Sequence, residues 1–234
     1  MRKHTCMAWT TALAALVLCA APAAAQEDED PDGGDGGQLR VALQAGYQSI
    51  DLEELNARLD GRGLAPFSDD YLTVGATASL LIHPVLAQAE AEALVEKEIT
   101  TVDFRRQLGG GRFYLNLGWP VYPTERSRLY PYGGIGVGTL RLESVETGPV
   151  PFDELLEDSG PATRLNNTEV VLQLGLGADV NVDGWSLGAR TGYAFAPAEG
   201  DWKSEEIDVL DGPDVGLEGF FVKGSVGIGG WSVP

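Results

Sequence analysis

Reactive and metal-binding side chains are scarce in this chain of 234 residues. The two cysteines, Cys6 and Cys19, lie close to the N-terminus, and the two histidines are His4 and His83. Beyond residue 25 the chain therefore has no cysteine to form a disulfide or act as a nucleophile, and one histidine to act as a base. Packing and backbone hydrogen bonds must supply the stability of that part.

Long apolar runs are also missing. The apolar stretch at residues 8–21 is shorter than the roughly 20 residues that a transmembrane helix needs, and no later segment reaches that length. It follows Arg2 and Lys3 and precedes three alanines at 23–25, a pattern that predicts a signal peptide over residues 1–25. Lipidation at Cys19 is the alternative, but the bulky Leu18 precedes it where that processing favours a small residue.

Basic residues are few. Lysine and arginine number 16 against 35 aspartates and glutamates, which gives a net charge of −19 and argues against nucleic acid as a partner. Residues 26–37 consist mostly of Asp, Glu and Gly, so we predict a disordered acidic segment there. Residues 38–234 remain to form the folded domain.

Strict alternation of apolar and small or polar residues dominates that remaining part. Trp185, Leu187 and Tyr193 share one face of their segment, while Ser186 and Arg190 share the other, and a period of two predicts a β-strand. The segment 86–98 would also suit a helix by its Ala and Glu content, but its neighbours favour a strand. The eight predicted strands are 38–48, 71–82, 86–98, 107–119, 128–143, 169–182, 185–195 and 219–231.

Short turns and long polar loops join these segments alternately. Asp183–Gly184 is a strong hairpin signal, whereas 49–70 and 196–218 are long. In the first long loop, leucines at helical spacing after Asp51, a candidate N-cap, predict a short helix. The sequence thus predicts an all-β fold, a closed antiparallel up-and-down transmembrane β-barrel of eight strands with both ends on the short-turn side.

The composition of the polar face decides which way the apolar face points. A soluble barrel of the lipocalin type would show water a face rich in Lys and Glu, but here this face is mostly Gly, Ser, Thr, Asn and Gln. Such residues fit a narrow lumen, so we expect the apolar face to contact lipid. Charges of both signs on the polar face would then have to pair. The predicted lumen ion-pair network comprises Arg40, Glu90, Glu92, Arg112, Asp179, Arg190 and Lys223.

Aromatic residues gather near the predicted strand ends, where amphipathic rings suit the level of the lipid headgroups. The residues assigned to this belt are Trp119, Trp185, Trp231, Tyr47, Tyr130, Tyr132 and Tyr193.

With its leader, the segment Asp-Leu-Glu-Glu-Leu-Asn at 51–56 and the closing glycine-rich strand at 219–231, the chain resembles the small eight-stranded outer-membrane β-barrel proteins of OmpA-type architecture. In particular it resembles uncharacterised outer-membrane β-barrel domains. The resemblance implies insertion by the barrel assembly machinery and contact with outer-membrane lipid and lipopolysaccharide.

No catalytic, cofactor-binding or metal site is expected. His83 falls in a predicted turn without a serine beside it, and Glu90 with Glu92 are better explained as partners of lumen arginines than as an acid–base pair. The acidic loops lack the regular ligand spacing of a calcium loop.

The sequence therefore favours a non-enzymatic, monomeric integral outer-membrane barrel, with both termini in the periplasm and with acidic extracellular loops in a structural or surface-recognition role. The extracellular partner stays open. A narrow pore for small solutes and a soluble periplasmic, lipocalin-like carrier are the alternatives.

Overall fold

The computed structural model describes residues 38–82, 84–101, 104–121, 124, 126–146, 162–198, 200–204, 207–209 and 211–229. The predicted signal peptide, the acidic segment 26–37, His83 and Trp231 lie outside these ranges. Within them, no helix combines the length and the apolar character needed to cross a membrane.

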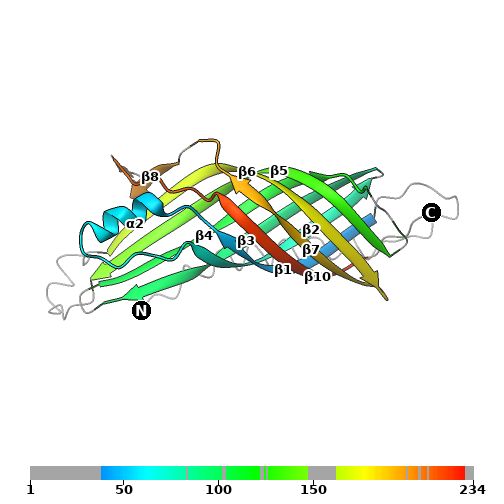
Figure 1. Cartoon of the computed structure of the whole chain (residues 1–234), viewed down its shortest axis with the longest axis horizontal. Coiled ribbons are helices and arrows are strands. Elements are labelled where there is room, and N and C mark those ends of the chain that lie inside the picture. The colour runs from blue at the N-terminus through cyan, green and yellow to red at the C-terminus, as the bar shows by residue number, and fades with distance from the viewer. Residues whose placement is uncertain are drawn as a thin grey trace.

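Eight antiparallel strands close into a barrel, in which each strand pairs with its neighbour along the chain and the last pairs with the first. The tilted strands wrap around one long axis (Figure 1). The barrel strands are β1 (Gln38–Ser49), β2 (Asp70–Ile82), β3 (Val85–Thr100), β4 (Phe104–Gly118), β5 (Ser127–Glu146), β6 (Ala162–Val182), β7 (Trp185–Phe195) and β10 (Gly219–Ile228).

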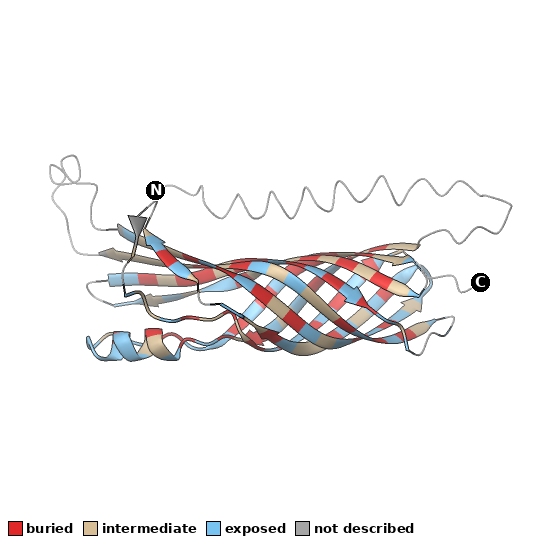
Figure 2. Cartoon of the chain, turned by 90° about the horizontal axis from the view of Figure 1, so that it is seen from above, coloured by how far each residue is buried: buried red, intermediate tan, exposed pale blue. Residues whose placement is uncertain are grey.

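Side chains alternate across the barrel wall as the sequence predicts. In β6, Gln173 is 1% exposed and faces the lumen, whereas its neighbour Leu174 is 59% exposed and faces outward. Burial classes alternate in the same way along the other strands (Figure 2). Because a lipocalin-like carrier would enclose its apolar side chains, this arrangement contradicts the soluble-carrier alternative.

The outward apolar surface has the height of a membrane core. On β6 it extends from Val170 to Val182, and Thr168 begins the polar part of the same face. At about 3.3 Å per residue and a tilt of roughly 45°, these residues cover about 28 Å along the barrel axis, close to the band of about 25 Å typical of outer-membrane barrels.

Strands β3 to β6 continue past this band at the end of the barrel that carries the long loops. β6 begins at Ala162, earlier than the predicted residue 169, and its pairing with β7 stops at Leu172. The unpaired edge at residues 166–168 is covered by a strand that the sequence did not predict, β8 (Asp201–Ser204), which pairs in turn with β9 (Ile207–Asp208). Covering an edge in this way satisfies its backbone hydrogen bonds.

The predicted loop helix is present as α2 (Glu53–Asp60). Its N-cap residue is Leu52 instead of the predicted Asp51, although the Asp51 carboxylate accepts a hydrogen bond from the Glu53 amide at 3.0 Å. Leu55 and Leu59 are buried, and α2 lies at the same end of the barrel as β8 (Figure 1).

A β-bulge between Leu94 and Lys97 shifts the alternation in β3. Simple alternation placed Glu96 on the lumen face with Glu90 and Glu92. The bulge turns Glu96 outward and pairs Lys97 with the inward-facing Leu108.

The assignment of two residues to the predicted aromatic belt is wrong. Tyr130 and Tyr132 are buried in the lumen, because they share the inward face of β5. The glycines opposite them make room: a Cβ on Gly177 would lie 2.3 Å from Tyr130, and one on Gly175 would lie 2.9 Å from Tyr132. The exposed belt residues in the described part are Tyr47, Trp119, Trp185 and Tyr193.

Candidate functional site

A cluster of five charged side chains fills the middle of the lumen. Glu90 of β3 accepts from Lys223 Nζ at 2.6 Å through Oε1 and from Arg190 Nη1 at 3.2 Å through Oε2. Glu92, two residues on, lies 2.8 Å from Lys223 and 2.7 Å from Arg112. All five side chains are almost completely buried.

Strand register brings these residues together. Glu92 is paired with Arg112 across β3 and β4, and Arg190 is paired with Lys223 across β7 and β10. The two pairs face each other across the lumen, so each carboxylate meets cations from a distant strand. Neutral side chains complete the set, since Gln44 and Asn116 both donate to Glu90.

The remaining two members of the predicted network form a separate pair. Arg40 of β1 reaches across to Asp179 of β6 at 2.5 Å, and it also donates to Ser225 at 3.0 Å. Arg128, which the sequence analysis did not include, is buried and stands opposite Asp179 in the β5–β6 register. The seven predicted residues thus all lie in the lumen, in two groups.

A leucine from a loop is buried next to the central cluster, and nothing in the sequence pointed to it. Leu217, in the loop before β10, is 1% exposed. Its amide donates to Glu169 at 2.5 Å, and its carbonyl accepts from Gln48 at 3.2 Å. Arg112 donates both to that carbonyl, at 3.5 Å, and to the Gln48 side chain. The lumen charges therefore hold the loop as well as the strands.

The same loop is fastened to α2. Arg58 donates to the carbonyls of Asp211 and Gly212, and Glu54 accepts from the Asp214 amide at 2.6 Å. The hydrogen bond from Arg58 and then that from the Asp214 amide lower the pKa of Glu54 below its ordinary value. α2 and residues 211–218 consequently form one layer, which we call the mouth cover.

A third segment joins the mouth cover. Trp202 of β8 is buried and donates through Nε1 to the Pro213 carbonyl at 2.7 Å. Near the base of α2, partial burial and the charges of Asp51 and Asp70 raise the pKa of Asp69.

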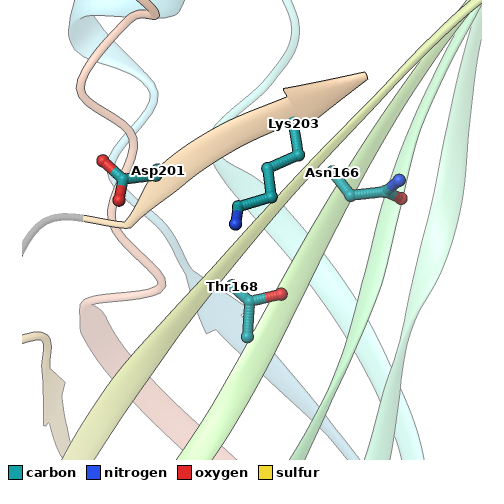
Figure 3. A pocket seen from close by; sticks show the side chains of 4 residues that line it. All are labelled: Asn166, Thr168, Asp201 and Lys203. Carbon is teal, nitrogen blue, oxygen red and sulfur yellow. The ribbon is translucent and has the colours of Figure 1, made fainter. Parts of the chain in front are cut away.

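An open polar hollow of about 400 Å³ lies between β6 and β8 on the outside of this region (Figure 3). It is lined by Asn166 and Thr168 from β6 and by Asp201 and Lys203 from β8. The lining thus offers one amide, one hydroxyl, one carboxylate and one ammonium.

The chemistry offered by the described residues is electrostatic. Across those ranges, no group of three or more His, Cys, Asp or Glu side chains is placed to hold a metal ion. Glu90, Glu92 and Asp179 are each paired with buried cations, and these pairs join strands that lie far apart in the sequence.

Several solved structures are similar to this chain. A major outer membrane protein from Thermus thermophilus matches with a TM-score of 0.54 at 10% identity, over 83% of this chain and 99% of that one. The attachment invasion locus protein Ail of Yersinia pestis matches at 0.46 and 12% identity, over 84% and 98%. Neisserial surface protein A matches at 0.45 and 12% identity, over 82% and 98%.

Among curated proteins, no sequence match was found. A family model does match, over residues 11–209, and its description is outer membrane protein beta-barrel domain. Since that match covers most of the chain and the fold agrees with it, the protein belongs to the outer membrane protein beta-barrel domain family, a family of the bacterial outer membrane.

Proposed function

We propose that this protein is a closed, non-enzymatic outer-membrane barrel whose mouth cover acts as a surface for structure or recognition. The observation that carries the proposal is the seating of Leu217 above the buried charge cluster. A lumen filled by side chains and capped by its own loop is suited to rigidity and unsuited to passing solutes.

The size of the barrel supports this reading against the narrow-pore alternative. Eight strands enclose a space just wide enough for side chains. Here large side chains, among them Arg112, Tyr114 and Tyr130, are fully buried inside. Opening a path would require separating Glu90 and Glu92 from their cations in a space that excludes water, which is costly.

The mouth cover supports a recognition role because it is rigid and acidic. Hydrogen bonds from Arg58, Trp202 and Gln48 fix its backbone at three points. Exposed carboxylates on it include Glu53, Asp60, Asp211 and Asp214. A preorganised surface binds a partner at a lower entropic cost than a disordered loop does. Its extracellular partner would carry a complementary, basic patch.

We also propose an orientation of the barrel in the outer membrane. The tight turn at Asp183–Gly184 lies at the end of the barrel that is opposite to α2, together with the first residues of β1 and the last residues of β10. Short turns face the periplasm in barrels of this kind. We therefore place both termini in the periplasm and the mouth cover outside, with outer-membrane lipid, lipopolysaccharide and the barrel assembly machinery as partners of a monomer. Epitope tags inserted at residue 62, after α2, should be labelled on intact cells, whereas tags at residue 183 should not.

Planar bilayers test the closed lumen. Purified protein should give no discrete conductance steps under conditions in which an established porin, reconstituted in parallel, gives them. Reproducible single-channel openings of the unmodified barrel would contradict the proposal and favour the pore.

A further inference from the structure

Two adjacent arginines on β4, Arg105 and Arg106, face opposite sides of the barrel wall. Arg105 points outward and pairs with Glu98 at 2.8 Å. Arg106 is six residues before the inward-facing Arg112 and shares its face, and it is 3% exposed. The side chain therefore lies inside the part of the barrel that extends toward the mouth cover.

Arg106 has no partner among the described residues. Its Nε, Nη1 and Nη2 atoms are all buried without a hydrogen-bond acceptor. Three other buried arginines that face the lumen differ, because Arg40, Arg112 and Arg190 each contact a carboxylate. A buried guanidinium without a counter-charge is strongly unfavourable, so such a group calls for an explanation.

The direct register partners of Arg106 carry no charge. Its register partners are Ile99 of β3 and Ser144 of β5. The acidic residues next to those partners, Glu98 and Glu143, belong to the opposite face and are paired with Arg105 and Arg164.

A second cation lies on the same side of the wall. Lys97 is paired with Leu108, which makes it a diagonal neighbour of Arg106 at roughly 7–8 Å between Cα atoms. Its ammonium lies 4.7 Å above the Tyr71 ring and donates to the Ser68 carbonyl at 3.5 Å. Neither contact is with a carboxylate, although Asp69 lies close enough to Lys97 for the ammonium to act on the pKa of that aspartate.

We propose that Arg106, with Lys97 beside it, binds a phosphate group at the inner wall of the barrel mouth. A guanidinium presents parallel N–H donors that match two oxygens of a phosphate, and the ammonium supplies a second positive charge. The group is either free phosphate or a phosphate carried by lipopolysaccharide, whose headgroups lie at this end of the barrel in the orientation proposed above.

Stability measurements with inorganic phosphate test the site. The unfolding midpoint of the wild-type barrel in detergent should rise on replacing chloride by phosphate at constant ionic strength, because a ligand of the folded state stabilises it. Arg106→Met should abolish this rise and weaken phosphate binding in calorimetry by at least about tenfold. Arg105→Met, the matched control on the other face, should behave as wild type.

The stability of Arg106→Met in the absence of phosphate tests whether the buried arginine is unpaired. In chloride, Arg106→Met should fold and be at least as stable as wild type, since methionine removes an unpaired buried charge. An equal phosphate shift in wild type and Arg106→Met, or no shift in either, would overturn the proposal.

A parallel arm identifies the source of the phosphate. Barrels in vesicles with lipopolysaccharide are compared with barrels in vesicles of the same phospholipids with added inorganic phosphate. A larger Arg106-dependent shift with lipopolysaccharide supports the lipid-borne group, and a shift with phosphate alone supports the free ion. Failure here leaves the closed-lumen proposal unaffected, because conductance does not depend on Arg106.

Discussion

At the residue scale, neighbouring side chains in one strand have opposite environments. Gln173 donates to Asn116 at 2.6 Å inside the lumen, while Leu174 faces lipid. Sequence parity was sufficient to assign both correctly. The assignment of Tyr130 and Tyr132 to the aromatic belt rests on their closeness to a strand end. Parity contradicts it, because both alternate with the exposed Leu129 along β5, and the opposing Gly177 and Gly175 leave room for their rings inside.

Substitutions at Leu174 and Gln173 should differ in their cost in unfolding free energy, because one side chain faces lipid and the other faces the lumen. Leu174→Arg, near the middle of the apolar band, should cost about 2–4 kcal/mol of unfolding free energy, because it places a charge in lipid. Gln173→Ala should cost much less, since it removes one neutral hydrogen bond. Denaturant unfolding in lipid vesicles measures both, and equal costs would mean that the faces are reversed.

The central carboxylate gives a second prediction. Glu90→Ala leaves Lys223 and Arg190 without their shared partner, and we expect a loss of about 3–5 kcal/mol. Glu98→Ala on the same strand is the matched control, because its pair with Arg105 is exposed and should contribute at most about 1 kcal/mol. Comparable losses in the two variants would refute the view that the lumen charges act as a buried unit.

At the element scale, the sequence predicted each barrel strand and the loop helix but missed β8 and β9. The barrel strands repeat a strong alternation over ten or more residues. β8 is four residues long, and its position depends on the free edge of β6 at residues 166–168. Because its pairing partner is some 35 residues away, β8 has no local sequence pattern that predicts it. The position of Leu217 is likewise not predictable from local sequence, since its hydrogen-bond partners come from β1, β4 and β6.

The attachment of α2 to residues 211–218 should depend on pH. The pKa of Glu54 is lowered in the folded protein, so its contacts stabilise the mouth cover at neutral pH, and this stabilisation is lost as the pH falls through the folded pKa. Amide hydrogen exchange at residues 211–214 should therefore accelerate under acid conditions relative to the barrel strands.

Glu54→Gln provides the control. It should exchange faster than wild type at neutral pH and show a weaker acceleration with acid. An unchanged pH profile in this variant would assign the effect to a carboxylate other than Glu54. Asp69 is not that group, because its raised pKa means that acid favours the folded state at this position.

At the scale of the whole molecule, the closed hydrogen-bonded ladder and the buried charges predict a barrel that resists detergent. Unheated samples should migrate on SDS gels at a different apparent mass from boiled ones, and the protein should fractionate with sarkosyl-insoluble membranes. Recovery as a freely soluble monomer would contradict the apolar exterior. Leu174→Arg should reduce the folded band while Gln173→Ala should retain it.

The sequence by itself determined the strand number, the antiparallel order and the direction of the apolar face, because a period of two is a local property that each strand carries independently. It also predicted seven charged residues on the inward face, since charges there are conspicuous among Gly, Ser and Gln, but it left out Arg106, Arg128 and Glu169, which are buried as well. Only the tertiary structure decided which charges meet, that Arg106 meets none within the described chain, and that Leu217 is buried against lumen residues. Those contacts join strands far apart in sequence, and their geometry depends on barrel closure and on strand register.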